Sequence, residues 1–153
     1  MQFSMFTLYP PRQCFSDGTS PVTHSAQYTR EYESIREACK KVLRKMPKDE
    51  ADKLIDTCLV SWVPSPRRSC TKVLEHPAAP TRAIWLDPCL SSYPEEVRVG
   101  IVAHEFAHAV CDHRIDNESC EHEADRTAAE WGFSAEIEAT RTYIRTGGGE
   151  PAP

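Results

Sequence analysis

The chain has 153 residues, of which 40% are hydrophobic and 27% charged, and its formal net charge is −5. These values are typical of one globular domain. No apolar run reaches the roughly 18 residues of a membrane span, and the first residues lack the basic and apolar regions of an export signal. We therefore expect a soluble, cytoplasmic protein that has no membrane segment.

The seven cysteines are scattered along the chain, and none forms a Cys-x-x-Cys pair. Their odd number and irregular spacing argue against a disulfide framework and against a cysteine zinc site. Most of them fall on predicted apolar faces, where a reduced cysteine behaves as a small hydrophobic side chain. We expect them to be reduced and structural.

Charge is distributed unevenly between two segments. Residues 36–72 hold ten Lys/Arg against five Asp/Glu, whereas residues 112–138 hold nine Asp/Glu against two Arg. The basic segment could bind nucleic acid, but its cationic residues fall on the exposed side of a helical pattern, so we favour a solvated helix face. The acidic segment favours a cationic peptide or protein partner.

The first half of the chain predicts helices followed by strands. Residues 1–27 contain three prolines and Gly18 and few periodic apolar positions, so they predict an irregular lead-in. Apolar residues at steps of four and three predict a helix over residues 28–46, which Pro47 ends. After a second, short helix, three segments are typical of strands: residues 58–63, 70–75 and 82–86.

The second half of the chain predicts three helices. Ser92, with Glu95 three residues later, predicts a capping box that starts a helix apolar on nearly every side and therefore buried. Asp116 or Asn117 is the expected cap of the next helix, and Gly132 its expected end. A last helix over residues 135–145 completes a single domain spanning residues 28–146, and residues 147–153 form a flexible tail.

The buried helix contains the stretch HEFAH. His104 and His108 are one helical turn apart on the same face, so both rings can reach one metal ion. Glu105 falls beside them, where it can take a proton from a zinc-bound water and return it to a leaving amine. Because burying these three groups unpaired would cost several kcal/mol, the sequence predicts a metal site.

A catalytic zinc needs a third protein ligand and an open fourth position. Glu121 and Asp125 share one face of the next helix, and thirteen residues from His108 to Glu121 suffice for the turn between the helices. We predict Glu121 as the third ligand and Asp125 as the hydrogen-bond partner of a ligand imidazole. His113 stays a rival third ligand, although on a continuous helix it lies about 180° from His104.

HExxH followed on the next helix by ExxAD resembles the pattern of the gluzincin metallopeptidases, among them the compact ImmA/IrrE-type peptidases and minimal single-domain zincins. The likeness covers roughly residues 82–133. It implies a small zincin-like α+β fold, with a short sheet packed on a central HExxH helix and on a following helix that carries a ligand. It also implies that the strand at residues 82–86 lines the cleft and holds an extended peptide by backbone pairing.

The sequence thus predicts a metallopeptidase with one Zn²⁺ per chain, acting on a peptide or protein. The predicted roles are His104, His108 and Glu121 as metal ligands, Glu105 as general base and acid, and Asp125 as support. One alternative is a zinc-stapled binding or regulatory module with the same fold and no turnover. A weaker alternative is a nucleic-acid-associated protein that uses residues 36–72.

Overall fold

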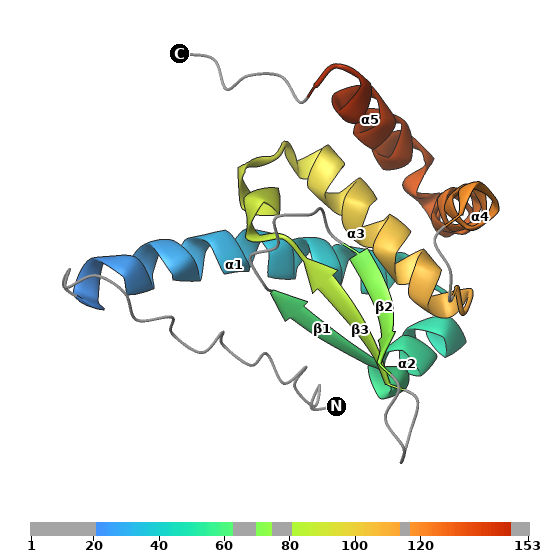
Figure 1. Ribbon diagram of the computed structural model, residues 1–153, viewed down its shortest axis with the longest axis horizontal. Coiled ribbons are helices and arrows are strands. Elements are labelled where there is room, and N and C mark those ends of the chain that lie inside the picture. Colours follow the sequence, from blue (N-terminus) through green and yellow to red (C-terminus); the bar gives the residue numbers. More distant parts are fainter. Residues whose placement is uncertain (1–20, 63–69, 75–80, 114–116, 148–153) are drawn as a thin grey trace.

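The computed structural model describes residues 21–62, 70–74, 81–113 and 117–147. Its elements in chain order are α1 (Pro21–Lys45), α2 (Lys48–Thr57), β1 (Cys58–Trp62), β2 (Cys70–Leu74), β3 (Thr81–Leu86), the 3₁₀ turn η1 (Pro88–Ser92), α3 (Glu95–Val110), α4 (Glu118–Ala128), the π-helical turn η2 (Ala129–Phe133) and α5 (Ser134–Arg145). The described chain therefore combines helices with one small sheet (Figure 1). All three predicted strands are present, within one residue of their expected ends.

Helix α1 begins earlier than expected. It starts at Pro21 rather than near residue 28, so residues 21–27 of the predicted lead-in are helical. Proline at the first position of a helix loses no hydrogen bond, because that N–H has no partner within the helix; reading Pro21 as a loop residue was therefore wrong. The remaining lead-in, residues 1–20, and residues 148–153 of the predicted tail lie outside the described residues.

The sheet has the strand order β1-β3-β2, with β1 parallel and β2 antiparallel to β3. Residues 82–86 of β3 pair with β1, and residues 81–85 pair with β2. The expectation that residues 82–86 hold an extended peptide by backbone pairing is therefore wrong, because neighbouring strands occupy both edges of β3. Within the described sheet, β2 is paired on one side only.

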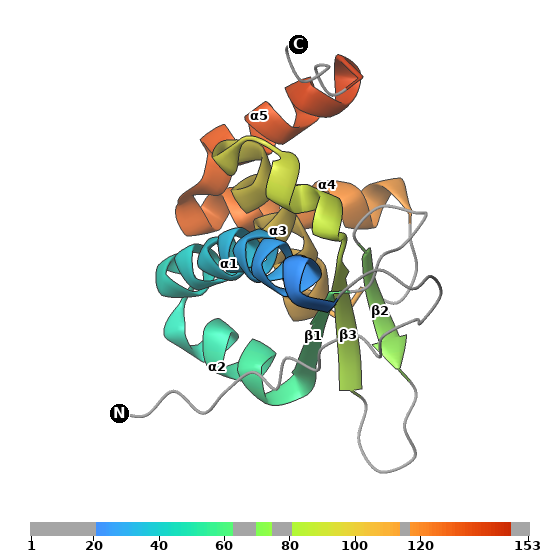
Figure 2. The same cartoon turned by 90° about the vertical axis from the view of Figure 1, so that its left-hand side faces the viewer.

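Helix α3 forms the centre of the molecule, as its apolar sequence predicted. It packs against α5, α4 and α1 and also contacts β2 and β3, so that helices and sheet surround it (Figures 1 and 2). Its buried residues are Val97, Val99, Gly100, Val102, Ala103, Glu105, Phe106, Ala107, His108 and Ala109. Among the described helices, none is both long and apolar enough to cross a membrane.

Gly100 allows α3 and α5 to approach closely. A Cβ atom at this position would lie 2.3 Å from Thr140 Oγ1 and 2.4 Å from the backbone oxygen of Glu136. We expect Gly100→Ala to lower the free energy of unfolding by about 1–3 kcal/mol, because an overpacked helix contact forces backbone shifts. Urea unfolding measures this change. Glu96→Ala at the exposed start of α3 is the control and should stay within about 0.5 kcal/mol of the parent; equal stability of both variants would contradict the close approach.

Two of the predicted helix ends are confirmed and one is wrong. Asn117 caps α4 by accepting a hydrogen bond from Cys120 N at 2.9 Å, and Gly132, with φ of 89°, separates α4 from α5. The capping box at the start of α3 is absent, since α3 starts directly after Pro94 with no side-chain cap. Ser92 Oγ instead donates to Cys89 O at 2.7 Å, within the turn η1.

None of the cysteines whose side chains the structure describes forms a disulfide. Free thiols occur at Cys39, Cys58, Cys89, Cys111 and Cys120. Burial in the core raises the pKa of Cys39 to about 12, which keeps this thiol protonated and unreactive. Cys39 therefore acts as a small hydrophobic side chain of α1.

Candidate metal centre

Two histidines of the HEFAH stretch meet on one face of α3. The Nε2 atoms of His104 and His108 lie 2.9 Å apart, and the ring centroids are 4.5 Å apart at nearly a right angle. His108 is buried, whereas His104 is partly exposed. The helical spacing therefore directs the same ring nitrogen of both residues to one point.

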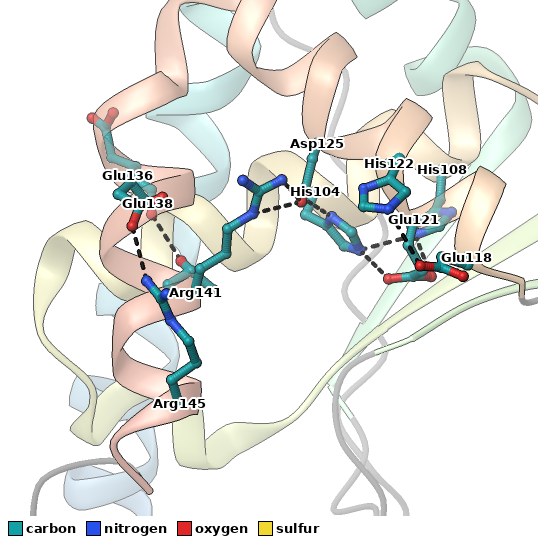
Figure 3. A network of polar contacts seen from close by, with 11 residues as sticks. His104, His108, Glu118, Glu121, His122, Asp125, Glu136, Glu138, Arg141 and Arg145 are labelled. Atoms are coloured by element: carbon teal, nitrogen blue, oxygen red, sulfur yellow. Dashed lines mark hydrogen bonds and ion pairs between the residues drawn. The ribbon is translucent and has the colours of Figure 1, made fainter.

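Glu121 reaches the same point from α4. Its Oε2 lies 3.1 Å from His104 Nε2, and its Oε1 lies 3.1 Å from His108 Nε2 (Figure 3). The Asn117 cap starts α4 so that Glu121 falls in its first turn. Together His104, His108 and Glu121 form a group that could hold a metal ion.

The donor atoms fit such an ion in type and in spacing. Two imidazole nitrogens and a carboxylate oxygen are donors that divalent transition metals accept. In a tetrahedral zinc site with bonds of 2.0–2.1 Å, neighbouring donors are about 3.3 Å apart, and the separations here are 2.9–3.1 Å. A small expansion of the group would therefore seat the ion.

The other nitrogen of His104 is held by an ion-paired carboxylate. His104 Nδ1 lies 2.8 Å from Asp125 Oδ1, and Arg141 on α5 donates to Asp125 Oδ2 from Nε at 3.0 Å and from Nη2 at 2.6 Å (Figure 3). Because a carboxylate accepts hydrogen bonds, a proton on Nδ1 would satisfy this contact and leave the lone pair of Nε2 for a metal ion. The structure thus brings Asp125 into hydrogen-bond contact with His104.

The electrostatics of the group favour a positive charge at its centre. Burial lowers the pKa of His104, but the hydrogen bond to Asp125 and the negative charges of Glu105, Asp125 and Glu121 outweigh burial and raise the pKa above its usual value. Burial raises the pKa of Asp125, but the contacts with His104 and Arg141 outweigh burial, and the pKa is below its usual value. Carboxylates that stabilise an imidazolium ion here would also stabilise a metal cation.

Glu105 lies next to His104 in α3, and only 6% of its surface is exposed. Its negative charge is one of the causes that raise the pKa of His104. Glu105 is therefore a buried carboxylate whose charge acts on His104.

No family model, curated protein or solved structure matches this chain. The function of the chain is therefore inferred from the geometry of the site.

His113 lies on the opposite side of His108 from Glu121. The helix ends at Val110, and Asp112 adopts a left-handed conformation with φ of 62°. This turn brings His113 N to His108 O at 3.2 Å and His113 Nδ1 to His108 Nδ1 at 2.8 Å. The donor group of His104 and His108 includes Glu121 and not His113, which instead forms a second group with Cys111 and Glu123.

Arg82 fixes the end of α3 against the sheet, a role that the sequence did not indicate. This buried side chain on β3 donates from Nη1 to Ala109 O at 2.6 Å and to His108 O at 3.4 Å, and it pairs with Asp112. A guanidinium ion at a helix C-terminus satisfies carbonyl groups that lack partners within the helix. Arg82 therefore holds the turn of α3 that carries His108.

Proposed function

We propose that the chain is a zinc-dependent peptidase with a small zincin-like fold. The observation that carries the proposal is the convergence of His104 Nε2, His108 Nε2 and the Glu121 carboxylate within 3.1 Å of one another. The buried Glu105 follows His104 directly in α3. Three protein ligands that leave a fourth position open are the arrangement of catalytic zinc sites, whereas structural sites use four.

Zinc is the ion that this donor set suits best. Imidazole and carboxylate donors in a compact group favour Zn²⁺ over Mg²⁺ and Ca²⁺, which prefer six or more oxygen ligands. When bound, Zn²⁺ would act as a Lewis acid toward a water molecule and a carbonyl oxygen. His104, His108 and Glu121 would hold one ion per chain.

Glu105 would move the proton during hydrolysis. Its carboxylate takes a proton from the attacking water as the water oxygen bonds to the carbonyl carbon, and it delivers that proton to the amine nitrogen as the C–N bond breaks. Burial of Glu105 suits both steps, because a low local dielectric strengthens its interaction with a proton. Asp125 and Arg141 keep the His104 ring in the orientation that binding requires.

An extended cationic peptide is the substrate that the described surroundings favour. The strand β2 contacts α3, and within the described sheet its second edge carries no strand, so a peptide could pair with its backbone there. The acidic side chains Glu118 and Glu123 are exposed on α4, on either side of Glu121 in the sequence. Their charge would attract basic side chains.

A binding module with a closed zinc site is the main alternative. Such a site would need a fourth protein ligand, for instance a cysteine or His113. In the part of the chain that the structure describes, the group around Glu121 contains neither a cysteine nor His113. This arrangement favours the peptidase.

Nucleic-acid binding through residues 36–72 is supported less. Three lysines of this segment donate to groups within the protein: Lys41 to Glu95, Lys45 to Gly132 O and Lys53 to Val110 O, each at 3.1 Å. These lysines therefore link α1 and α2 to other elements of the protein. Residues 63–69 of the segment lie outside the described residues.

Asp125→Ala is expected to weaken zinc binding about 10–100-fold, because the His104 ring loses the partner that fixes its orientation. Asp125→Asn should bind zinc more tightly than Asp125→Ala, since the amide oxygen still accepts from Nδ1. Competition with a chromogenic chelator measures both affinities, and Glu130→Ala, at an exposed position in η2, is the control. Equal affinity of Asp125→Ala and the parent would show that Asp125 does not position His104.

The proposed activity is tested with a mixture of random peptides incubated with the zinc-loaded chain. Mass spectrometry should show new peptide ends, enriched in basic residues near the cut. Removal of zinc with 1,10-phenanthroline should abolish cleavage, and added zinc should restore it. A zinc-loaded chain that cleaves neither the mixture nor unfolded basic proteins would contradict the peptidase and favour the binding module.

A further inference from the structure

A second group of metal-binding side chains lies beside the first. Cys111 follows the end of α3, His113 lies in the turn after it, and Glu123 is on α4. One donor atom from each residue lies within 4.8 Å of the other two. The side chain of His113 is 8% exposed and that of Glu123 is 47% exposed, so the group opens toward the solvent on one side.

The local backbone explains why these residues meet. The left-handed conformation of Asp112 folds the chain back, so that His113 Nε2 faces Glu123 Oε2 at 3.1 Å. Cys111 Sγ faces the same helix, 3.4 Å from Thr127 Oγ1. A thiolate, an imidazole and a carboxylate suit Zn²⁺ or Co²⁺, and the sulfur donor disfavours Mg²⁺ and Ca²⁺.

The two groups share one hydrogen bond. His108 Nδ1 and His113 Nδ1 are 2.8 Å apart, and one of the two atoms must donate a proton to the other. A neutral imidazole carries only one N–H. The position of this single proton therefore decides whether Nε2 of His108 or Nε2 of His113 is unprotonated.

Each position of the proton enables one group and disables the other. If His108 Nδ1 donates, His108 Nε2 is free to bind a metal with His104 and Glu121, and His113 must carry its proton on Nε2, where it donates to Glu123. If His113 Nδ1 donates, His113 Nε2 is free to bind a metal, and His108 Nε2 carries a proton. A ligand nitrogen has to be unprotonated.

We propose that Cys111, His113 and Glu123 form a second metal site, for a thiophilic divalent ion, whose occupancy excludes an ion at His104, His108 and Glu121. An ion in the second site would therefore switch the first site off, and an ion in the first site would leave His113 and Glu123 to orient His108. The exclusion rests on the zinc site proposed above, whereas the second site does not.

Cobalt titration tests both parts, because a thiolate bound to Co²⁺ gives a charge-transfer band in the near ultraviolet. In His104→Ala, which removes one ligand of the first site, one Co²⁺ per chain should bind and produce this band. The band should disappear in His104→Ala/Cys111→Ser and persist in His104→Ala/Cys120→Ser, where Cys120 is a cysteine of α4 outside both groups. Glu121→Ala is a second way to remove the first site if His104→Ala proves unstable by circular dichroism.

The parent chain tests the exclusion. It should bind one Co²⁺ and no second ion at saturation, and the first ion should give no thiolate band. Two ions bound at once to the parent would overturn the exclusion. Absence of the band in both folded variants would overturn the second site. A thiolate band from the first ion bound to the parent would instead support the second site and count against the zinc site proposed for the peptidase.

Discussion

Glu105→Gln is expected to lower kcat/KM for peptide cleavage by about 10²–10⁴-fold while zinc content and fold stay those of the parent. The amide has nearly the same shape as the carboxylate and cannot accept a proton from the attacking water. Because Glu105 does not belong to the donor group of His104, His108 and Glu121, its loss leaves every predicted ligand in place. Cleavage rates, zinc analysis and circular dichroism of the same preparation measure the three properties.

Glu96→Gln is the matched control for this variant. Glu96 is an exposed glutamate in the first turn of the same helix, far along α3 from the histidines. Its amide variant should cleave peptides at the parental rate. Cleavage by Glu105→Gln at the parental rate would show that another group moves the proton.

Glu121→Ala is expected to weaken zinc binding by more than roughly 10–100-fold. That range is typical when a residue that hydrogen-bonds to a metal ligand is removed. The substitution removes one of three donors directly, and His104 and His108 alone would hold the ion from one helix face. The affinity is best measured in a Cys111→Ser background. Zinc then cannot bind to Cys111, His113 and Glu123, so the measured affinity belongs to the first group. Competition with a chelator of known affinity gives the dissociation constant.

Two comparisons sharpen this result. Glu118→Ala removes a carboxylate one turn earlier on α4, which approaches the exposed His122 and not the donor group, and it should bind zinc like the parent. His113→Ala should weaken binding less than Glu121→Ala, because the His113 side chain contacts His108 at Nδ1 and not at Nε2, the atom that belongs to the donor group. If His113→Ala had the larger effect, the third ligand would have to be reassigned to His113.

The parts of the site that lie within one helix were predictable from the sequence. The spacing of His104 and His108 follows from the helical repeat, and the apolar residues around them predicted burial. Glu121 could also be predicted, because a cap at Asn117 and a short connection fix where the next helix begins. In each case the signal lies in a few consecutive residues.

The parts that depend on distant contacts were not predictable. Arg141 reaches Asp125 across the break at Gly132, and the angle of that break is not encoded in the spacing of the two residues. In the sequence, Arg82 has no feature that distinguishes it from other strand residues, although its side chain donates to the carbonyl groups at the end of α3. Its role becomes visible only when β3 and α3 are placed side by side.

Two predictions from short sequence patterns were wrong because neighbouring residues changed the local structure. The sequence between Ser92 and Glu95 matches a capping box, but the preceding 3₁₀ turn uses the Ser92 hydroxyl, and Pro94 takes the position next to the helix. His113 was expected about 180° from His104 on a continuous helix. The helix instead ends before it, and the left-handed Asp112 turns His113 back onto His108.

The central claim is tested most directly by measuring how zinc binds to the purified parent chain, using elemental analysis together with X-ray absorption at the zinc edge. The account predicts one zinc per chain, surrounded by nitrogen and oxygen donors at about 2.0–2.2 Å and by no sulfur. A chain that holds no zinc even after zinc is added back would contradict the metal centre. A sulfur donor at about 2.3 Å would place the ion with Cys111 and would contradict the peptidase site.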